Sequence, residues 1–290
     1  MKYKTMMNNF AIFIMVHGRP DKSWTYKSLR NQGYTGKIFL VADDLDESRF
    51  EYKEIYGDEL IIFDKKKAAL EMDAGDNTDD LRSTLFSANT IFKLAKERDL
   101  KYFFIMCDDY TGFYHNFKEK HSRYYWKKTR IHNLDKIMKI MVDFYKKTPI
   151  TTLAMSQGGD FIGGDSGSNS EVKLLRKAMN SFLCSTDRPF KFIGRLNEDV
   201  TTYVNLGSKG TLFATITNIM LVQTAHQQEK SGLTDVYLDY GTYVKSFFSV
   251  MYNPSSIKVS AMGSKNFRIH HRVKWKNAVP VLLNQIHRKL

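Results

Sequence analysis

The sequence has 290 residues, of which 42% are hydrophobic and 13% aromatic, so it can build a sizeable core and global disorder is excluded. Its 44 Lys and Arg residues outnumber its 31 Asp and Glu residues. The formal charge of +13 favours polyanionic partners such as nucleic acid, an anionic membrane surface or phosphorylated small molecules. The two cysteines exclude a disulfide framework and indicate a reduced, cytosolic protein, and no apolar run near the start is long enough to cross a bilayer.

The first 110 residues alternate between predicted strands and predicted helices. The strands are expected at 10–16, 37–42, 60–63 and 102–107, and the helices at about 21–31, 47–56 and 83–98. This order predicts an α/β fold with a doubly wound, mostly parallel central sheet. Ligands bind beyond the carboxyl ends of the strands in such sheets. In this sequence those ends carry His17, Arg19, Asp43, Asp44, Asp108 and Asp109.

The second half is more mixed. The elements expected there are a helix at about 133–146, a strand at 151–155, β-like runs at 211–217 and 219–222, a helix at about 237–251 and a strand at 257–261. A glycine-rich stretch at 158–170 predicts a mobile loop near a ligand. No internal repeat or linker is visible, so we expect one domain over 1–290.

Three groups of residues could carry chemistry. Asp108 and Asp109 follow a buried strand, where carboxylates could hold Mg²⁺ or Mn²⁺ against a diphosphate, or could simply cap a loop. Glu198 and Asp199 open a short predicted helix and could supply a general base, or could be an acidic N-terminal pair without chemistry. The pair His270 and His271 could ligate a metal or face a diphosphate, although a surface pair is as common.

Arg82 opens the helix that follows Asp80. It could clamp a diphosphate by its bidentate fork, or form an ordinary ion pair at a helix start. No Gly-x-Gly-x-x-Gly or Walker pattern is present, which argues against classical dinucleotide binding and P-loop NTP hydrolysis.

Basic residues are concentrated in two segments. The segment 118–130 interleaves six basic residues with three aromatic ones, and residues 240–290 hold nine Lys or Arg and no acidic side chain. Either could be an ordinary solvated face. The aromatic interleaving favours contact with a polynucleotide, because cations hold phosphates while flat rings can stack on bases.

In their order along the chain, these motifs resemble a nucleotide-sugar glycosyltransferase of the GT-A type. The runs 12–20 and 39–44 look like the first two strands of that fold, and the helix carrying Arg82 and Asn89 before 103–109 looks like the approach to its metal motif. More narrowly, His-Gly-Arg-Pro at 17–20 with the later Arg-x-Asn-Glu-Asp at 195–199 is similar to the TET-associated glycosyltransferases of bacteriophages. That family is implied to attach sugars to 5-hydroxymethylpyrimidines, of the cytosine or uracil type, in phage DNA.

The resemblance implies a role for each matching position. Nucleotide-sugar contacts are implied for His17, Arg19, Asp43, Asp44, Arg82, Asn89 and Asp108. The donor would be a nucleoside diphosphate sugar, UDP-linked, with Mn²⁺ or Mg²⁺ bound by Asp109 and by His270 or His271. Asp199 or Glu198 would be the base, and one base opposite the leaving group gives inversion. A strict Asp-x-Asp motif would need an acid at Tyr110, which weakens the implied metal requirement.

The resemblance also implies how the chain is divided and where it acts. Residues 1–110 would bind the nucleotide sugar, residues 111–290 would bind the acceptor, and the site of action would be the cytoplasm of an infected bacterial host. A target base in duplex DNA would have to leave the stack, and the basic segments would offset that cost through phosphate contacts. The expected DNA-binding residues are Lys118, Lys120, Arg123, Tyr124, Tyr125, Trp126, Lys127, Lys128, Arg130, Arg272, Lys274 and Lys276.

Three alternatives stay open at this point. The acceptor could be a cell-surface or lipid-linked glycan, although neither end of the chain shows an amphipathic basic helix for a membrane. The chain could be a DNA-binding protein without enzymatic activity, in which the acid pairs are structural. It could also be a nucleotidyltransferase with the same sheet and the same metal-binding carboxylates.

Overall fold

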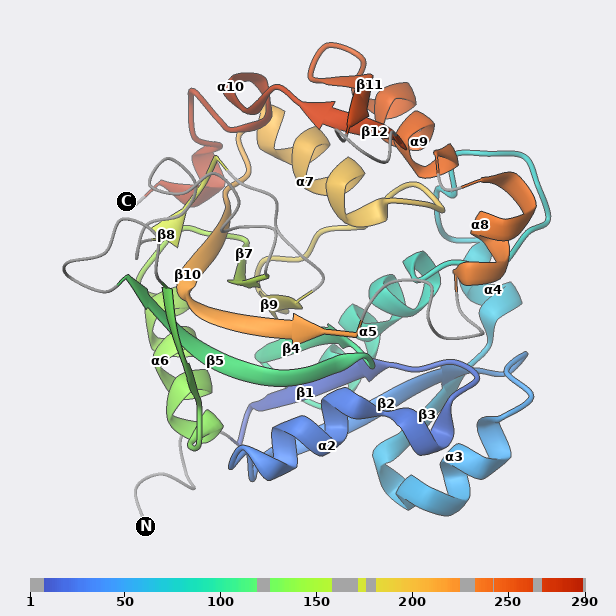
Figure 1. Cartoon of the computed structure of the whole chain (residues 1–290), viewed down its shortest axis with the longest axis vertical. Helices are drawn as coiled ribbons and strands as arrows, with labels where there is room; N and C mark the ends of the chain where they lie inside the picture. Colours follow the sequence, from blue (N-terminus) through green and yellow to red (C-terminus); the bar gives the residue numbers. More distant parts are fainter. Residues whose placement is uncertain are drawn as a thin grey trace.

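The computed structural model describes residues 8–118, 126–157, 172–175, 181–224, 233–241, 243–262 and 268–288. Within these residues ten strands form one sheet and two more form a small antiparallel sheet (Figure 1). The expected α/β fold class is confirmed. The glycine-rich stretch predicted as a loop at 158–170 lies outside the described residues.

The first half of the sheet is parallel. It contains β1 (Phe10–Met15), β2 (Lys37–Asp43), β3 (Leu60–Phe63) and β4 (Tyr102–Cys107), in the spatial order β3-β2-β1-β4. These strands form from continuous apolar runs because both faces of the sheet are covered. In β1, Phe10, Ile12 and Ile14 pack on one face of the sheet, and Ala11 and Phe13 pack on the other.

Different helices cover the two faces of the sheet. The helices of the first half are η1 (Pro20–Lys22), α2 (Trp24–Asn31), α3 (Arg49–Tyr56), η2 (Gly57–Glu59), α4 (Lys65–Ala69) and α5 (Leu85–Glu97). The core on one face joins α2 and α3 to α6 (Leu134–Lys146), and the core on the other face joins α5 to α7 (Glu198–Ser208). Helix α4 was not predicted, because its sequence is short and lysine-rich and shows no helical periodicity. Asp64 caps it by accepting a hydrogen bond from the backbone N–H of Lys67.

The second half of the sheet is mixed. It adds β5 (Tyr110–Lys118), β6 (Trp126–Arg130), β7 (Thr152–Ser156), β8 (Val172–Lys173), β9 (Ser181–Ser185) and β10 (Phe213–Gln223). The order continues β4-β9-β7-β10-β5-β6, and only the β7–β10 pair is parallel in this half. The two β-like runs predicted at 211–217 and 219–222 are one strand, β10. Its pairing with β7 shifts register between Ile216 and Met220, which is where the predicted runs separate.

The last part of the chain lies over one face of the sheet, together with α7 (Figure 1). It contains α8 (Thr234–Tyr240), α9 (Val244–Tyr252), β11 (Ile257–Met262), β12 (Arg268–Val273), α10 (Trp275–Ala278) and η5 (Gln285–His287). The single helix predicted at about 237–251 is wrong. It is divided into α8 and α9 at Gly241, whose φ of 82° is incompatible with a continuing helix.

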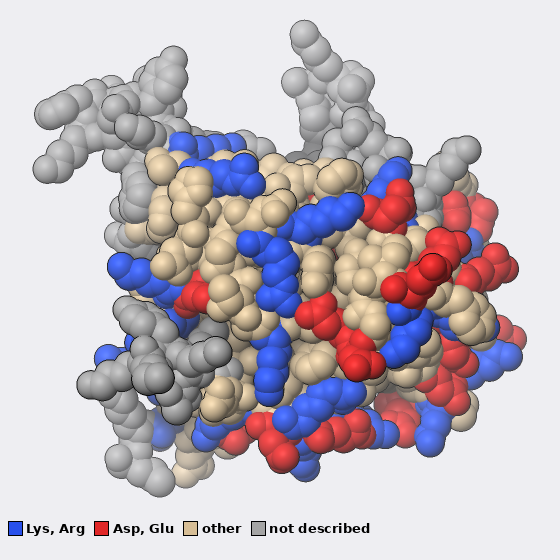
Figure 2. All heavy atoms as spheres, turned by 90° about the horizontal axis from the view of Figure 1, so that it is seen from below, with Lys and Arg blue, Asp and Glu red and all other residues tan. Residues whose placement is uncertain are grey.

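Charged side chains of both signs share the surface. Seen from the side of α2, α3 and α6, Lys and Arg side chains form a band across the middle of the molecule, and Asp and Glu gather toward one side (Figure 2). None of the helices in the described ranges is long and apolar enough to cross a bilayer.

A buried glutamine joins α2 to the second half of the sheet. The Gln32 side chain donates to the carbonyl oxygens of Phe113 and Ile131, both at 2.7 Å, and accepts from the N–H of Phe113 at 2.9 Å. We predict that Gln32→Leu lowers the free energy of unfolding by at least about 2 kcal/mol, because three buried backbone groups lose their partner. Urea denaturation checks this. The exposed neighbour Asn31→Ala is the control, and an equal loss in both variants would contradict the expectation.

Candidate active site

The carboxyl ends of β1 and β2 meet in a group of one histidine, two carboxylates and one lysine. His17 Nδ1 lies 3.6 Å from both Asp43 Oδ2 and Asp46 Oδ2, and the buried Lys65 Nζ lies 3.0 Å from Asp43 Oδ2. Burial alone would raise the pKa of Asp43, but the hydrogen bonds from His17 and Lys65 together lower it. The Asp43 hydrogen bond in turn raises the pKa of His17 despite partial burial. The Asp44 carboxylate binds a backbone group, because it accepts a hydrogen bond from the N–H of Lys65 at 2.8 Å.

A second ion pair joins the ends of β1 and β4. Arg19 Nη2 lies 2.6 Å from Asp108 Oδ1, and the backbone N–H of Arg19 donates to the hydroxyl of Tyr52 at 3.0 Å. Within the described residues, Asp108 Oδ2 and Arg19 Nε are buried without a hydrogen-bond partner. Burial raises the pKa of Asp108 to about 7, although the Arg19 charge acts in the opposite direction. This carboxyl therefore has one oxygen available for a ligand that donates a hydrogen bond.

Asp109 is hydrogen-bonded to the C-terminal end of β10. Its carboxylate Oδ2 accepts from the side-chain amide of Gln223 at 2.7 Å, and its carbonyl oxygen accepts from the N–H of Thr224 at 3.0 Å. The adjacent Tyr110 begins β5, so one short segment connects β4, β5 and β10. The acid pair thus lies where the parallel part of the sheet meets the mixed part.

The other acid pair begins α7, as the sequence predicted. Glu198 accepts a hydrogen bond from the hydroxyl of Thr84, and Asp199 Oδ1 accepts from the N–H of Val200 at 2.7 Å. Asn197 precedes them in the left-handed region at φ 59°. Its side-chain amide donates to the Ser249 hydroxyl of α9 at 2.5 Å, which fixes the start of α7 against α9.

The two acid pairs converge on the same buried groups. Desolvation is the main cause of the raised pKa of the Tyr110 hydroxyl, and both Asp109 and Asp199 add to it. Desolvation also raises the pKa of the Cys107 thiol, with further contributions from Asp109, Asp108 and Glu198. Carboxylates more than 80 residues apart in the sequence therefore create one negative potential at the carboxyl end of β4. This acidic cluster consists of Asp108, Asp109, Glu198 and Asp199.

The expected metal ligands are not assembled into a preformed site. In the parts of the chain with described coordinates, no group of three His, Cys, Asp or Glu side chains could hold a metal ion. His270 and His271 lie in β12 with their ring centroids 4.2 Å apart, and His271 Nδ1 lies 3.3 Å from the side-chain nitrogen of Asn197. The structure therefore links the histidine pair to the start of α7 and not to a three-ligand group with Asp109.

Arg82 and Asn89 already have protein partners. Arg82 pairs with Asp80 at 2.9 Å and with Asp239 of α8 at 2.6 Å. The Asn89 side chain donates to the carbonyl oxygen of Phe192 at 3.0 Å and accepts from its N–H at 2.8 Å. Both residues thereby hold neighbouring segments in place, whatever else they bind.

Arg195 is a charged residue whose role the sequence analysis missed. It is buried, and it pairs with Asp76 at 2.8 Å and with Asp80 at 3.0 Å, while its carbonyl oxygen accepts from the Ser83 hydroxyl at 2.5 Å. Only its place in the Arg-x-Asn-Glu-Asp motif marked it in the sequence. Asp46 and Lys65 were missed as well, because the contacts that bring them to this site, from Gly18 to Asp46 and from Lys65 to Asp43, join residues 28 and 22 positions apart.

The expected DNA-binding residues fall into two separate groups. Lys128 and Arg130 are exposed on β6, and Arg272, Lys274 and Lys276 are exposed on and after β12. Strand β6 is at one edge of the ten-stranded sheet, whereas β12 belongs to the separate two-stranded sheet, so the two groups of described cations lie on different sheets. Lys120, Arg123, Tyr124 and Tyr125 lie outside the described residues, and Lys118, Trp126 and Lys127 are described only by their backbone.

The raised pKa of Asp108 predicts a trend of stability with pH. Between a pKa of 3.8 in the unfolded chain and about 7 in the folded protein, the folded state binds the extra proton, so this group lowers stability as pH rises. We expect the free energy of unfolding of the wild type to fall between pH 4 and pH 8 through this group, while that of Asp108→Asn does not. The difference between the two proteins should therefore grow with pH, by at most about 1.4 kcal/mol for each unit by which the Asp108 pKa differs between the folded and unfolded states. Urea titrations across this range measure it.

The matched control is Asp58→Asn, which removes an exposed carboxylate and should show no such trend. A relative stability of Asp108→Asn that stays constant with pH would show that Asp108 is ionised throughout the range.

Comparison with known proteins identifies the family. The model of the TET-associated glycosyltransferase family matches residues 10–232, from the start of β1 to beyond the end of β10. No curated protein matches the chain. The crystal structure of a mycobacterial protein is similar with 8% identity and a TM-score of 0.47, over 94% of this chain and 86% of that one. Because the family model covers most of the sequence, the chain belongs to the TET-associated glycosyltransferases and is an enzyme that uses a nucleotide-sugar donor.

Proposed function

We propose that the enzyme transfers a sugar from a UDP-linked donor to the hydroxymethyl group of a 5-hydroxymethylpyrimidine in DNA, with inversion at the sugar carbon. The observation that carries this proposal is that one carboxylate from each acid pair, Asp109 at the end of β4 and Asp199 at the start of α7, adds to the pKa of the buried Tyr110 hydroxyl, which burial already raises. One pair would face the donor and the other would face the acceptor hydroxyl.

The donor half of the proposal rests on Arg19 and Asp108. Asp108 Oδ2 is buried with no partner in the described structure, so a ribose or sugar hydroxyl that donates to it would remove an energetic cost. Arg19 has one contact with Asp108 and an unpartnered Nε, whereas Arg82 is shared between two carboxylates. Arg19 is therefore the better candidate to contact the diphosphate, and His17, Asp43 and Asp44 would form the wall beside it.

A divalent cation would neutralise charge on the diphosphate leaving group. Mg²⁺ is commonly held by one or two carboxylates together with substrate phosphates, and this mode needs no three-residue protein site. Asp109 is the residue that would share such an ion with the diphosphate. His271 lies against Asn197, next to the acid pair that begins α7, and His270 lies against His271, so the histidine pair would be a further contact for this ion or for the diphosphate.

The acceptor is an alcohol, so its proton must pass to a base as the new bond forms. Asp199 suits this role better than Glu198, which accepts the Thr84 hydroxyl and so lies against α5. Asp199 and Asp109 both add to the raised pKa of Tyr110, whose main cause is burial, so the proposed base and the proposed metal ligand act on one buried hydroxyl. We assign Asp199 as the base and Glu198 as the residue that positions the start of α7.

The base assignment predicts unequal effects of two conservative variants. Asp199→Asn should lower kcat by about 100-fold or more, because the amide cannot accept the proton. Glu198→Gln keeps an oxygen for the Thr84 hydroxyl and should retain most of the activity. Steady-state kinetics with hydroxymethylated DNA measures both, and the opposite ranking would assign the base to Glu198.

DNA as the acceptor is supported by the charge of +13 and by exposed cations outside the acidic cluster. The substitutions Lys128→Glu and Arg130→Glu together should weaken DNA binding. They should also make the slope of log affinity against log salt concentration shallower, by about one unit for each phosphate that is no longer neutralised. Donor binding should not change. Fluorescence anisotropy at several salt concentrations, beside calorimetry with the sugar nucleotide, separates the two effects.

The matched control exchanges Lys93 and Lys96 for Glu, because both are exposed on α5 and give the same change in net charge. Equal loss of DNA affinity in both double variants would mean that only total charge matters, and β6 would then not be a DNA contact.

The substrate itself is tested by mass spectrometry after incubation with a panel of sugar nucleotides and Mn²⁺. We expect one sugar added to hydroxymethylated DNA and none added to unmodified DNA. Transfer to glycan acceptors but not to DNA would overturn the proposed acceptor and leave the glycosyltransferase assignment intact.

A further inference from the structure

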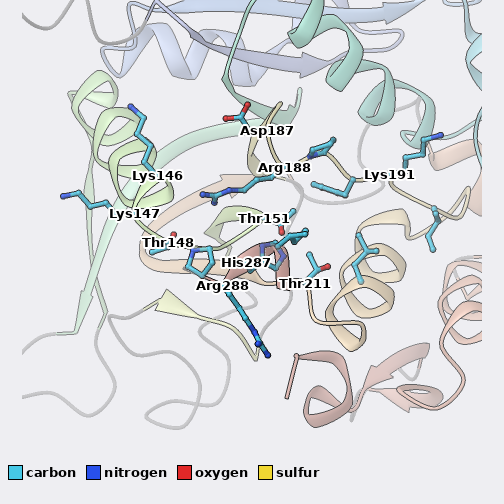
Figure 3. Close-up of a pocket in the computed structure, with 16 residues that line it drawn as sticks. Lys146, Lys147, Thr148, Thr151, Asp187, Arg188, Lys191, Thr211, His287 and Arg288 are labelled. Carbon is cyan, nitrogen blue, oxygen red and sulfur yellow. The ribbon is translucent and has the colours of Figure 1, made fainter. Parts of the chain in front are cut away.

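A second candidate site lies far from the acidic cluster. It is a cavity with a volume of about 620 Å³, within the size range of small-molecule sites. It is formed by the segment before β7, the segment after β9, Leu206 of α7, Thr211 shortly before β10, and the last described turn of the chain, η5. Figure 3 shows His287 among the lining side chains, with Lys146 and Lys147 on one side and Lys191 on the other.

The lining is strongly cationic. It includes Lys146, Lys147, Arg188, Lys191 and Arg288 and a single carboxylate. That carboxylate, Asp187, is already paired with Lys101 at 2.7 Å. In the described part of the chain, no carboxylate lies within 4 Å of Lys147, Lys191 or Arg288. A pocket with unpaired cations and a neutralised acid favours an anionic ligand.

One buried polar atom in this pocket has an unused hydrogen-bonding capacity. His287 is 7% exposed, and its Nε2 has no hydrogen-bond partner among the described residues. The turn that carries it is anchored at Asn284, whose N–H donates to the Gly210 carbonyl at 3.1 Å and whose side chain accepts from the N–H of Ile286 at 3.2 Å. The turn that carries the ring is therefore anchored, and a ligand oxygen at Nε2 would remove the cost of the unsatisfied nitrogen.

Arg188 is fixed beside this ring. It donates to the carbonyl oxygen of Ile150 at 2.6 Å, and its guanidinium lies 4.6 Å from the centroid of the Tyr145 ring. Its charge reaches His287, because together with burial it lowers the pKa of that residue. The floor of the pocket thus combines a fixed cation with a neutral ring nitrogen, and flexible Lys and Arg side chains surround it. Such a mixture suits the several oxygens of a phosphate group.

The pocket and the acidic cluster are separate sites. Thr151 and Thr211 precede β7 and β10, so the pocket lies at the edge of the sheet where these parallel strands begin. Asp43 and Asp108 lie at the edge where their strands end. Strand β10 connects the two edges, since its last residue, Gln223, binds Asp109. Its 11 residues at roughly 3.3 Å each give a strand that is at most roughly 35 Å long, and the two sites lie at its opposite ends.

We propose that this pocket binds a phosphate group, with His287 and Arg188 at its floor and Lys191, Arg288 and Lys147 around its rim. The phosphate could belong to a free phosphorylated molecule or to the backbone of a nucleic acid, and the shared chemistry is an oxyanion with several acceptor oxygens. The inference does not depend on the sugar acceptor proposed above.

The experiment follows the imidazole signals of His287 by NMR in the full chain, assigned by comparison with His287→Gln. Titration with inorganic pyrophosphate, and separately with a duplex oligonucleotide, should shift these signals saturably. Exchanging Lys191 and Arg288 together for Glu should weaken the affinity at least tenfold, and both residues are exposed, so folding should be unaffected. The Lys93→Glu and Lys96→Glu double variant controls for net charge and should bind like the wild type.

Each outcome decides the question. A shift with pyrophosphate alone supports a free phosphorylated ligand, and a shift at lower concentrations of oligonucleotide supports a nucleic-acid backbone. His287 signals that stay unchanged at saturating concentrations of both probes overturn the proposal, and so does unchanged affinity in the Lys191 and Arg288 variant. No sugar transfer is measured, so failure here is distinguishable from failure of the proposed reaction.

Discussion

The burial of several carboxylates at one edge of the sheet is the constraint on which the rest of this enzyme depends. An ionised carboxylate out of water is costly unless hydrogen bonds or cations compensate it. The fold brings such groups from distant segments: Arg19 for Asp108, Gln223 for Asp109 and Thr84 for Glu198. Compensation is incomplete: burial is the main cause of the raised pKa values of Tyr110 and Cys107, and the negative potential of these carboxylates adds to both. A cluster of this kind binds hydroxyl donors and cations well, as transfer from a sugar nucleotide requires.

Holding the proposed base in position requires a rigid support, and buried ion pairs join the start of α7 to the rest of the fold. Arg195 is bound to Asp76 and Asp80, so the segment that leads into α7 is joined to the loop before α5. Removing one member of such a buried network leaves an uncompensated charge, which is strongly destabilising. The same network includes Arg82 through Asp80. An arginine that the sequence marked as a ligand for diphosphate therefore already contributes to the support.

The sequence predicts the apolar strands of the parallel half well, but it misses β5, β6, β8, β9 and β12 and predicts the pairings poorly. The sequences of β1, β3 and β4 are apolar throughout. A strand that is covered on both faces of the sheet needs apolar side chains at every position, whatever the strands beside it. Strand β12 was missed because its basic and histidine residues lack an alternating pattern, and it exists through pairing with β11. Arg19 and Asp108 are 89 residues apart. Their positions at strand ends were predictable, but their contact follows from the order β2-β1-β4, which the sequence does not state.

The distribution of charge along the sheet bears on the size of the acceptor. Lys128 pairs in register with Asn116, seven residues beyond Asp109 and so roughly 20 Å from the acidic cluster. At physiological salt the screening length is about 8 Å, so a cation at that distance has little effect on a small acceptor beside the cluster. Only a long anionic molecule could contact both places at once. Because the exposed cations of β6 lie far from the reactive edge, they can assist only an acceptor that is long enough to reach them, which is why we favour DNA over a small glycan.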